Sequence, residues 1–93
     1  MRIEILYFAV LRERAGRGGE TLELPTGARV REARTAIAAR HPAISPLLPR
    51  VQIAVNRAVV GEDHPLREGD ELAFLPPVSG GSTPRASRSG SFR

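Results

Sequence analysis

The sequence has 93 residues, enough for one small domain with a thin hydrophobic core and too few for a deep active site. It has no cysteine, which excludes disulfides, thiolate metal sites and cysteine nucleophiles, and no apolar run near the roughly 20 residues of a membrane helix. The formal net charge is +4, but residues 1–81 carry 11 of the 14 basic residues, all arginine, against all 10 acids, so a nucleic-acid surface is not predicted on the body of the chain.

The first half of the chain predicts two strands and a helix. Residues 2–10 (RIEILYFAV) are apolar on both faces and predict a strand, followed by a glycine-rich turn at 16–19. Residues 20–24 (ETLEL) alternate between polar and apolar and predict the returning strand of a hairpin. Residues 30–41 place a narrow, alanine-rich apolar stripe at helical spacing and predict a helix, which Pro42 ends.

The second half predicts shorter elements. Residues 43–49 contain two prolines and predict a connector with one short helical turn. The segments after it are a strand, a very short strand, a polar loop and a last strand, at residues 51–55, 59–60, 61–69 and 71–75. Pro76 and Pro77 end the last strand, because proline cannot donate a ladder hydrogen bond.

This order of elements predicts an α+β fold, the ubiquitin-like β-grasp, with a mixed sheet of four to five strands and one main helix on one face. The predicted domain spans residues 1–81. Residues 82–93 are rich in serine and arginine and cannot bury enough apolar surface to offset the entropy of ordering. We therefore expect a disordered C-terminal extension over residues 82–93.

One helix covers only one face of such a sheet, so the other face is predicted to be bare. The face against the helix is predicted to carry Ile3, Ile5, Tyr7, Val51, Ile53, Val55, Leu72 and Phe74. The opposite face receives Leu6, Phe8, Ala54, Ala73 and Leu75, with Val59 beside them. A contiguous apolar surface favours a partner interface, with a homodimer or a covering loop as the alternatives. A register shift of one residue would exchange the two faces.

The body of the chain offers no catalytic or metal-binding constellation. His41 and His64 are each followed by proline, lack metal-ligand spacing, and are interpreted as structural or solvated. The glycines at 16–19 are not a phosphate-binding loop, because they lack the lysine and no helix follows them. We therefore predict no bound cofactor and no metal, and with no signal peptide we predict a cytoplasmic location without a membrane.

The segment that remains is 74–81 (FLPPVSGG), where a strand ends in two prolines and a Ser-Gly-Gly run. Further stretches agree with it along the chain, at residues 8–13 (FAVLRE), 24–27 (LPTG), 54–56 (AVN), 64–66 (HPL) and 69–71 (GDE). Together they cover essentially all of residues 1–81, and the chain resembles the family of molybdopterin synthase small subunits, which are ThiS-type ubiquitin-like sulfur carriers. Glycine has no Cβ, so a Gly-Gly end can thread a narrow channel in an extended form.

The resemblance implies a function. The carboxylate of Gly81, presented with Gly80, would be adenylated by an ATP-dependent partner enzyme and converted to a thiocarboxylate. The thiocarboxylate would donate sulfur to the pterin precursor on the large synthase subunit, in molybdenum cofactor biosynthesis, so the chain would not be catalytic alone. The family's docking surface matches four residues, Phe8, Arg12, Val59 and Leu75.

Two departures from the family leave alternatives open. Arg29 stands at the helix start, where the family often has a threonine N-cap, and this weakens the predicted helix. Ser82 follows Gly81, so either a protease removes residues 82–93, or the extension is not native, or the protein is not a sulfur donor. The alternatives are a sulfur carrier for thiamine, cysteine or tRNA thiolation and a non-catalytic ubiquitin-like binding module. Nucleic-acid binding would rest on the arginines after residue 81.

Overall fold

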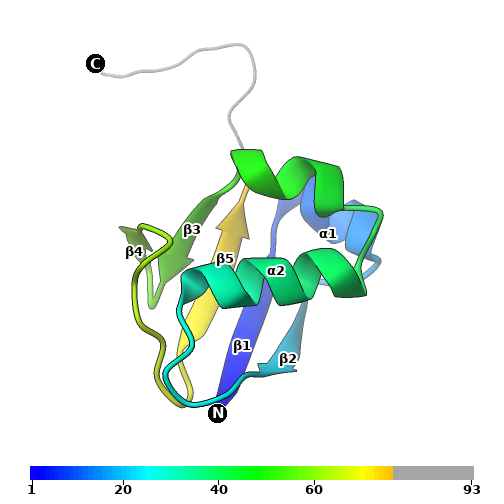
Figure 1. The fold of residues 1–93 in the computed structure, drawn as a ribbon. Helices are drawn as coiled ribbons and strands as arrows, with labels where there is room; N and C mark the ends of the chain where they lie inside the picture. The colour runs from blue at the N-terminus through cyan, green and yellow to red at the C-terminus, as the bar shows by residue number, and fades with distance from the viewer. Residues whose placement is uncertain (77–93) are drawn as a thin grey trace, which may run out of the picture.

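The computed structural model describes residues 1–76 (Figure 1). The elements in chain order are β1 (Arg2–Tyr7), α1 (Ala9–Ala15), β2 (Gly19–Glu23), α2 (Val30–Arg40), the 3-10 helix η1 (Ser45–Arg50), β3 (Gln52–Val55), β4 (Ala58–Val60) and β5 (Glu71–Leu75). Within these 76 residues, five strands form one mixed sheet in the order β2-β1-β5-β3-β4. β1 and β5 run parallel, and the other neighbours run antiparallel. Because α2 crosses one face of this sheet, the predicted α+β β-grasp fold is confirmed (Figure 1).

The hydrophobic core lies between α2 and the sheet. Val30, Ala33 and Ile37 form the buried stripe of α2, as their helical spacing predicted. The eight residues predicted for the covered face are all buried, and they are Ile3, Ile5, Tyr7, Val51, Ile53, Val55, Leu72 and Phe74. Each fully buried aliphatic side chain contributes about 2 kcal/mol, so this layer holds the helix on the sheet.

The strand predicted over residues 2–10 is wrong after Tyr7. β1 ends there, Phe8 follows as an N-cap residue, and Ala9–Ala15 form α1. The apolar residues of 2–10 run on into Leu11, so the sequence pattern predicted a long strand. In the fold, Leu11 is instead fully buried as a residue of α1. Gly16 ends α1 in the left-handed conformation, with φ of 77°, as a C-terminal glycine often does.

The other predicted elements agree with the observed ones to within one residue. The connector at 43–49 contains η1, so the short helical turn predicted there is confirmed. Leu48 of η1 is buried, and the guanidinium of Arg34 on α2 donates to its carbonyl oxygen at 2.5 Å. This contact fastens the connector to the main helix.

The start of α2 is capped by groups other than the side chain of its N-cap residue, Arg29. The backbone N–H of Arg29 donates to the Glu32 carboxylate at 2.6 Å. The next two N–H groups donate to carbonyl oxygens of the loop before β5, Val30 to His64 at 3.0 Å and Arg31 to Glu62 at 3.1 Å. The loop therefore supplies the acceptors that an arginine side chain cannot offer.

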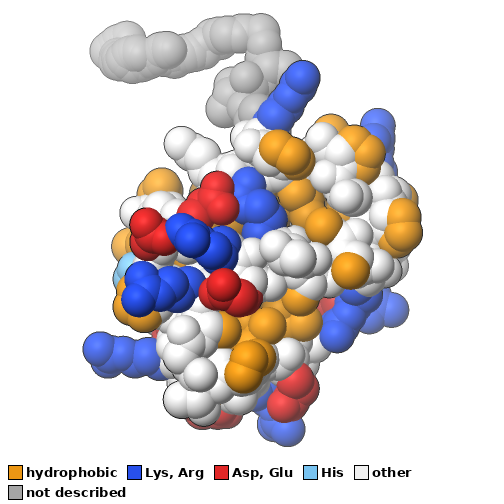
Figure 2. Space-filling view, in the orientation of Figure 1, with side chains coloured by type: hydrophobic (Ala, Val, Ile, Leu, Met, Phe, Trp, Pro, Cys, Tyr) orange, Lys and Arg blue, Asp and Glu red, His pale blue; other side chains and the backbone are white. Residues whose placement is uncertain are grey.

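Basic and acidic side chains gather over α2 and the loop before β5 (Figure 2). Arg31 forms an ion pair with Asp63, and the Arg34 guanidinium lies 3.8 Å from the Glu62 carboxylate. The outer surface where α2 meets this loop is therefore charged. Within residues 1–76, none of the helices has the length and apolar character needed to span a membrane.

Candidate functional site

The strand that leads to the predicted carrier end is held on both sides. β5 pairs with β1 and with β3, and its pairing with β3 extends to Leu75. Pro76 then follows the strand and cannot donate a ladder hydrogen bond. Gly80 and Gly81 lie outside the described residues, as does the extension at 82–93, so the domain boundary at 81 stays a prediction.

The sheet face away from α2 carries a row of apolar side chains set side by side by strand pairing. Leu6 lies opposite Ala73, which lies opposite Ala54. Ala54 in turn lies opposite Val59, so one row crosses β1, β5, β3 and β4. The two alanines in the middle of the row are small and leave a hollow of about 390 Å³ between larger side chains. This apolar hollow is lined by Leu6, Phe8, Ala54, Arg57, Val59, Glu71, Ala73 and Leu75.

Two large apolar side chains of the hollow are exposed to solvent. Phe8 is 44% exposed and Val59 is 62% exposed, whereas Phe74 on the covered face is fully buried. Exposed apolar residues that gather around one hollow are typical of a surface that another molecule covers. Within the described residues this face of the sheet is bare, as the strand pattern predicted.

Three of the four predicted docking residues come together in the structure. Phe8, Val59 and Leu75 all line the apolar hollow. Arg12 lies on α1 and lines a separate hollow with Arg17 and the glycine-rich turn. The backbone N–H of Arg12 donates to the Phe8 carbonyl oxygen at 3.4 Å, so the two residues are neighbours although their side chains line different hollows.

Two charged residues at the apolar hollow were not found by sequence reasoning. Arg57 lies in the turn between β3 and β4, and Glu71 begins β5. The period-two alternation of Glu71 with Ala73 and Leu75 was a signal that could have placed Glu71 on this face. Arg57 carried no such signal, because its position depends on how β3 and β4 pair.

A buried ionic cluster lies on the covered side, at the C-terminal end of α2. The Glu20 side chain is only 6% exposed, and its carboxylate accepts hydrogen bonds from the Tyr7 hydroxyl at 2.5 Å and the Arg40 guanidinium at 2.8 Å. His41 Nε2 lies 2.5 Å from Oε2, the same carboxylate oxygen that accepts from Tyr7. The cluster ties β1, β2 and α2 together, which fits the interpretation of His41 as structural.

The two acids of this cluster have shifted pKa values. Burial alone would raise the pKa of Glu20, but hydrogen bonds from Tyr7, Arg40 and His41 outweigh it and lower the pKa to about 2. Burial, reinforced by the hydrogen bond to Glu20, raises the pKa of Tyr7 well above its ordinary value. Glu20 is therefore ionised and Tyr7 neutral at physiological pH.

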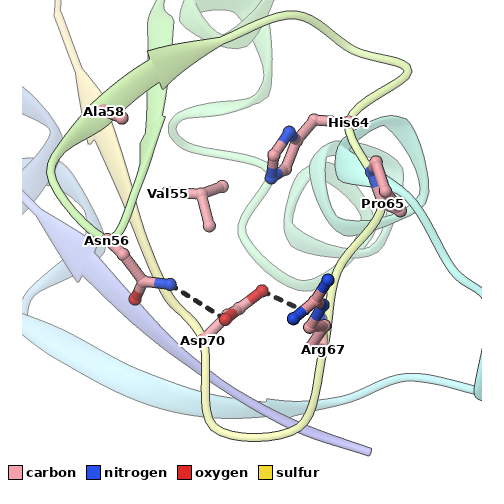
Figure 3. A pocket seen from close by; sticks show the side chains of 7 residues that line it. All are labelled: Val55, Asn56, Ala58, His64, Pro65, Arg67 and Asp70. Carbon is pink, nitrogen blue, oxygen red and sulfur yellow. Dashed lines mark hydrogen bonds between the residues drawn. The ribbon is translucent and has the colours of Figure 1, made fainter.

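A third hollow, of about 350 Å³, lies where the loop before β5 meets the β3–β4 turn (Figure 3). The ring of His64 faces it, together with Asp70 and Asn56. The Asp70 carboxylate accepts from the Asn56 amide at 2.9 Å and from the Arg67 backbone N–H at 2.8 Å. One Asp70 oxygen thus binds the β3–β4 turn and the other binds the loop, and within residues 1–76 no hydrogen bond joins Asp70 to His64. Among residues 1–76 there is no group of three side chains that could hold a metal ion.

Comparison with known proteins identifies the family. Residues 5–81 match the ThiS family.

The chain belongs to the ThiS family.

A ThiS relative from Chlamydomonas reinhardtii is the sulfur carrier subunit of molybdopterin synthase, and it is 40% identical over 83 residues, covering 87% of this chain and 100% of that protein. A putative molybdopterin converting factor subunit 1 from Pyrococcus furiosus is 36% identical with a TM-score of 0.76, covering 84% of this chain and 99% of that one. A complex of subunits 1 and 2 of the Helicobacter pylori molybdopterin-converting factor contains a chain that is 26% identical with a TM-score of 0.65, covering 87% of this chain and 100% of that one.

These likenesses confirm the resemblance seen in the sequence. This ThiS-family chain functions as a sulfur carrier of the molybdopterin synthase type. Sulfur carriage for thiamine, cysteine or tRNA thiolation is not favoured, and neither is a non-catalytic binding module. The sulfur-carrying residue and the partner surface are proposed below.

Proposed function

We propose that this chain carries sulfur as a thiocarboxylate on Gly81 and donates it to a pterin precursor on the large subunit of molybdopterin synthase. The observation that carries the proposal is the family match, which extends through Gly80 to Gly81. β5 supports it as well, because a central strand held by both neighbours gives a fixed starting point for the segment that ends at Gly81.

The chemistry requires only a free carboxylate from this chain. A carboxylate oxygen of Gly81 attacks the α-phosphorus of ATP on an adenylating partner enzyme, and pyrophosphate leaves. Sulfide supplied by that partner then adds to the acyl carbon, AMP leaves with the electrons of the broken C–O bond, and the remaining S–H proton is lost to solvent. The resulting thiocarboxylate is an anionic nucleophile at neutral pH. The proposal assigns ATP to the activating partner and no bound cofactor to this chain.

Docking of the large subunit is assigned to the apolar hollow. Phe8, Val59 and Leu75 supply exposed or half-buried apolar surface there, and Arg12 lies on the adjoining helix. An interface of this kind has an apolar centre and a polar rim. The Helicobacter pylori complex of subunits 1 and 2 supports a two-subunit assembly for the relative, and we place the assembly of this chain in the cytoplasm.

Removal of residues 82–93 is the step that exposes the carboxylate. Ser82 follows Gly81, so the carbonyl of Gly81 is an amide until that peptide bond is hydrolysed. We assign this hydrolysis to a protease of the same cell. Adenylation then requires the shortened chain and not the full one.

The intact mass of the protein from its native cells tests the proposal. We expect a chain that ends at Gly81, with a fraction of the molecules at the mass of the thiocarboxylate. A single species that retains residues 82–93 would contradict sulfur carriage on Gly81 and would favour a ubiquitin-like binding module.

A further inference from the structure

The β3–β4 hairpin holds two non-glycine residues in the left-handed region. Asn56 has a φ of 50° and Arg57 has a φ of 74°, and they form the two-residue connection between the paired residues Val55 and Ala58. Positive φ at both central positions marks a type I′ turn, which favours asparagine followed by glycine. Asn56 fits that preference, but an arginine at the second position is strained because its Cβ crowds the backbone.

Asn56 has a clear structural role in this turn. Its backbone N–H donates to the Glu71 carbonyl oxygen at 2.8 Å, and its side-chain oxygen accepts from the Glu71 N–H at 3.0 Å. Its side-chain amide also donates to the Asp70 carboxylate at 2.9 Å (Figure 3). These three bonds fix the hairpin to the start of β5, so the backbone of the next residue is held in place.

Arg57 has no comparable structural role within residues 1–76. It is exposed, and its guanidinium forms no ion pair with an acid of that part of the chain. A glycine in its place would fit the turn better, so the fold alone does not account for an arginine. Strained residues that persist without a structural reason tend to lie at functional sites.

The location of Arg57 indicates its functional role. Arg57 and Glu71 are the two charged residues that line the apolar hollow, and its other lining residues are apolar. Arg57 therefore stands where a rigid turn presents a cation at the rim of an exposed apolar surface. A guanidinium in this position matches a carboxylate better than an ammonium would, because its planar N–H groups can bind both oxygens.

We propose that Arg57 is a specificity-determining residue of the apolar hollow. Its guanidinium pairs with an acidic side chain of the large synthase subunit. The proposal rests on the docking assigned above. The turn fixes the backbone of Arg57 beside the apolar hollow before the partner arrives, so no backbone freedom is lost there when the ion pair forms. The partner's acid thereby favours a carrier with a cation at this turn position over a carrier without one.

Arg57→Gly separates this role from a structural one, because its effects on stability and binding have opposite signs. Replacing the strained arginine with glycine is expected to raise the Tm of the full 93-residue chain by about 4 °C. The same change is expected to weaken binding of the large subunit about tenfold in titration calorimetry at low salt, and to make binding less dependent on salt. Arg57→Lys keeps the charge and is expected to restore most of the salt dependence.

Arg2→Gln is the matched control, because it removes the same charge from an exposed position at the start of β1. We expect it to leave affinity for the large subunit within twofold of the wild-type value. A raised Tm with unchanged affinity for Arg57→Gly would overturn the role of Arg57 and leave the docking surface intact. Absence of binding by the wild-type chain would overturn the docking surface itself, and the role of Arg57 with it.

Discussion

Single residues in this protein affect the free energy of unfolding through their protonation state or their backbone angles. Glu20 is a buried carboxylate with three hydrogen-bond partners from two elements, and Ala9 is an exposed alanine with a φ of 51°. Neither environment is visible in the local sequence. Both lead to measurable effects on the free energy of unfolding.

Glu20 is expected to make the stability of the fold fall in acid. Its pKa is about 2 in the folded protein, below its ordinary value of 4.5. The stability it contributes, on the order of 3 kcal/mol, is therefore fully present above about pH 4.5 and is lost as the pH falls towards 2. Urea unfolding of wild type and Glu20→Gln from pH 6 to pH 2 should show a difference that shrinks over this window.

The control for Glu20 is Glu23→Gln, on the same strand but with an exposed side chain. It is expected to change the free energy of unfolding by less than about 0.5 kcal/mol at every pH in the series. A pH-independent loss in Glu20→Gln would show that packing, and not the ionised carboxylate, is what the substitution removes.

Ala9→Gly is expected to stabilise the protein. The positive φ of Ala9 costs an L-residue about 1–2 kcal/mol, and glycine avoids this cost at the expense of some unfolded-state entropy. We expect a net gain of about 0.5–1 kcal/mol in urea unfolding. Ala39→Gly, at an exposed position within α2, provides the opposite case and should lose about 1 kcal/mol. A loss of stability in both variants would contradict the left-handed conformation of Ala9.

At the scale of elements, α2 depends on a segment that is distant in the sequence. The N-terminal N–H groups of the helix donate to carbonyl oxygens of Glu62 and His64, and to the carboxylate of Glu32 through the backbone of Arg29. The weak helix start expected from Arg29 is thus compensated by the loop before β5. This contact also connects the helix start to the loop that leads into the carrier strand.

Glu32→Ala is expected to destabilise the fold by about 1 kcal/mol. The substitution leaves the Arg29 N–H without its acceptor and removes a negative charge from the positive end of the helix. Thermal unfolding should show a lower Tm for Glu32→Ala. Thr35→Ala, one turn further along and exposed, should leave the Tm unchanged or raise it slightly, because alanine is the better helix former. An equal loss of Tm in both variants would contradict capping by Glu32.

For the whole molecule, the two faces of one sheet serve different purposes. The face under α2 holds the core, and the opposite face presents the apolar hollow. Phe8 and Phe74 illustrate the difference, because they are the same residue type at 44% and 0% exposure. The stability of the fold and its proposed docking are therefore separable by mutation.

Phe8→Ala is expected to weaken binding of the large subunit by tenfold or more while changing stability by less than about 1 kcal/mol. Phe74→Ala should instead cost about 3–5 kcal/mol of folding free energy, because it opens a cavity in the core. Calorimetric titration with the large subunit, alongside urea unfolding, measures both effects. Severe unfolding of Phe8→Ala would mean that Phe8 supports the core and that the hollow is not a free surface.

The sequence by itself determined the strands, the main helix and the face of each strand residue, because strand alternation and helical spacing are local patterns. It also determined the family, since the Gly80-Gly81 end and its preceding prolines are contiguous in the chain. The tertiary structure decided the rest. It made a helix of Ala9–Ala15, since burial of Leu11 outweighed a strand-like apolar run.

The tertiary structure also decided which polar groups meet. Glu20 lies 13 residues from Tyr7 and 21 from His41, so only folding brings these side chains together. Arg57 reaches the apolar hollow only because β3 and β4 pair across a two-residue turn. Local patterns fix which way a side chain faces, whereas contacts between distant segments depend on how the whole chain packs, and no short stretch of sequence encodes them.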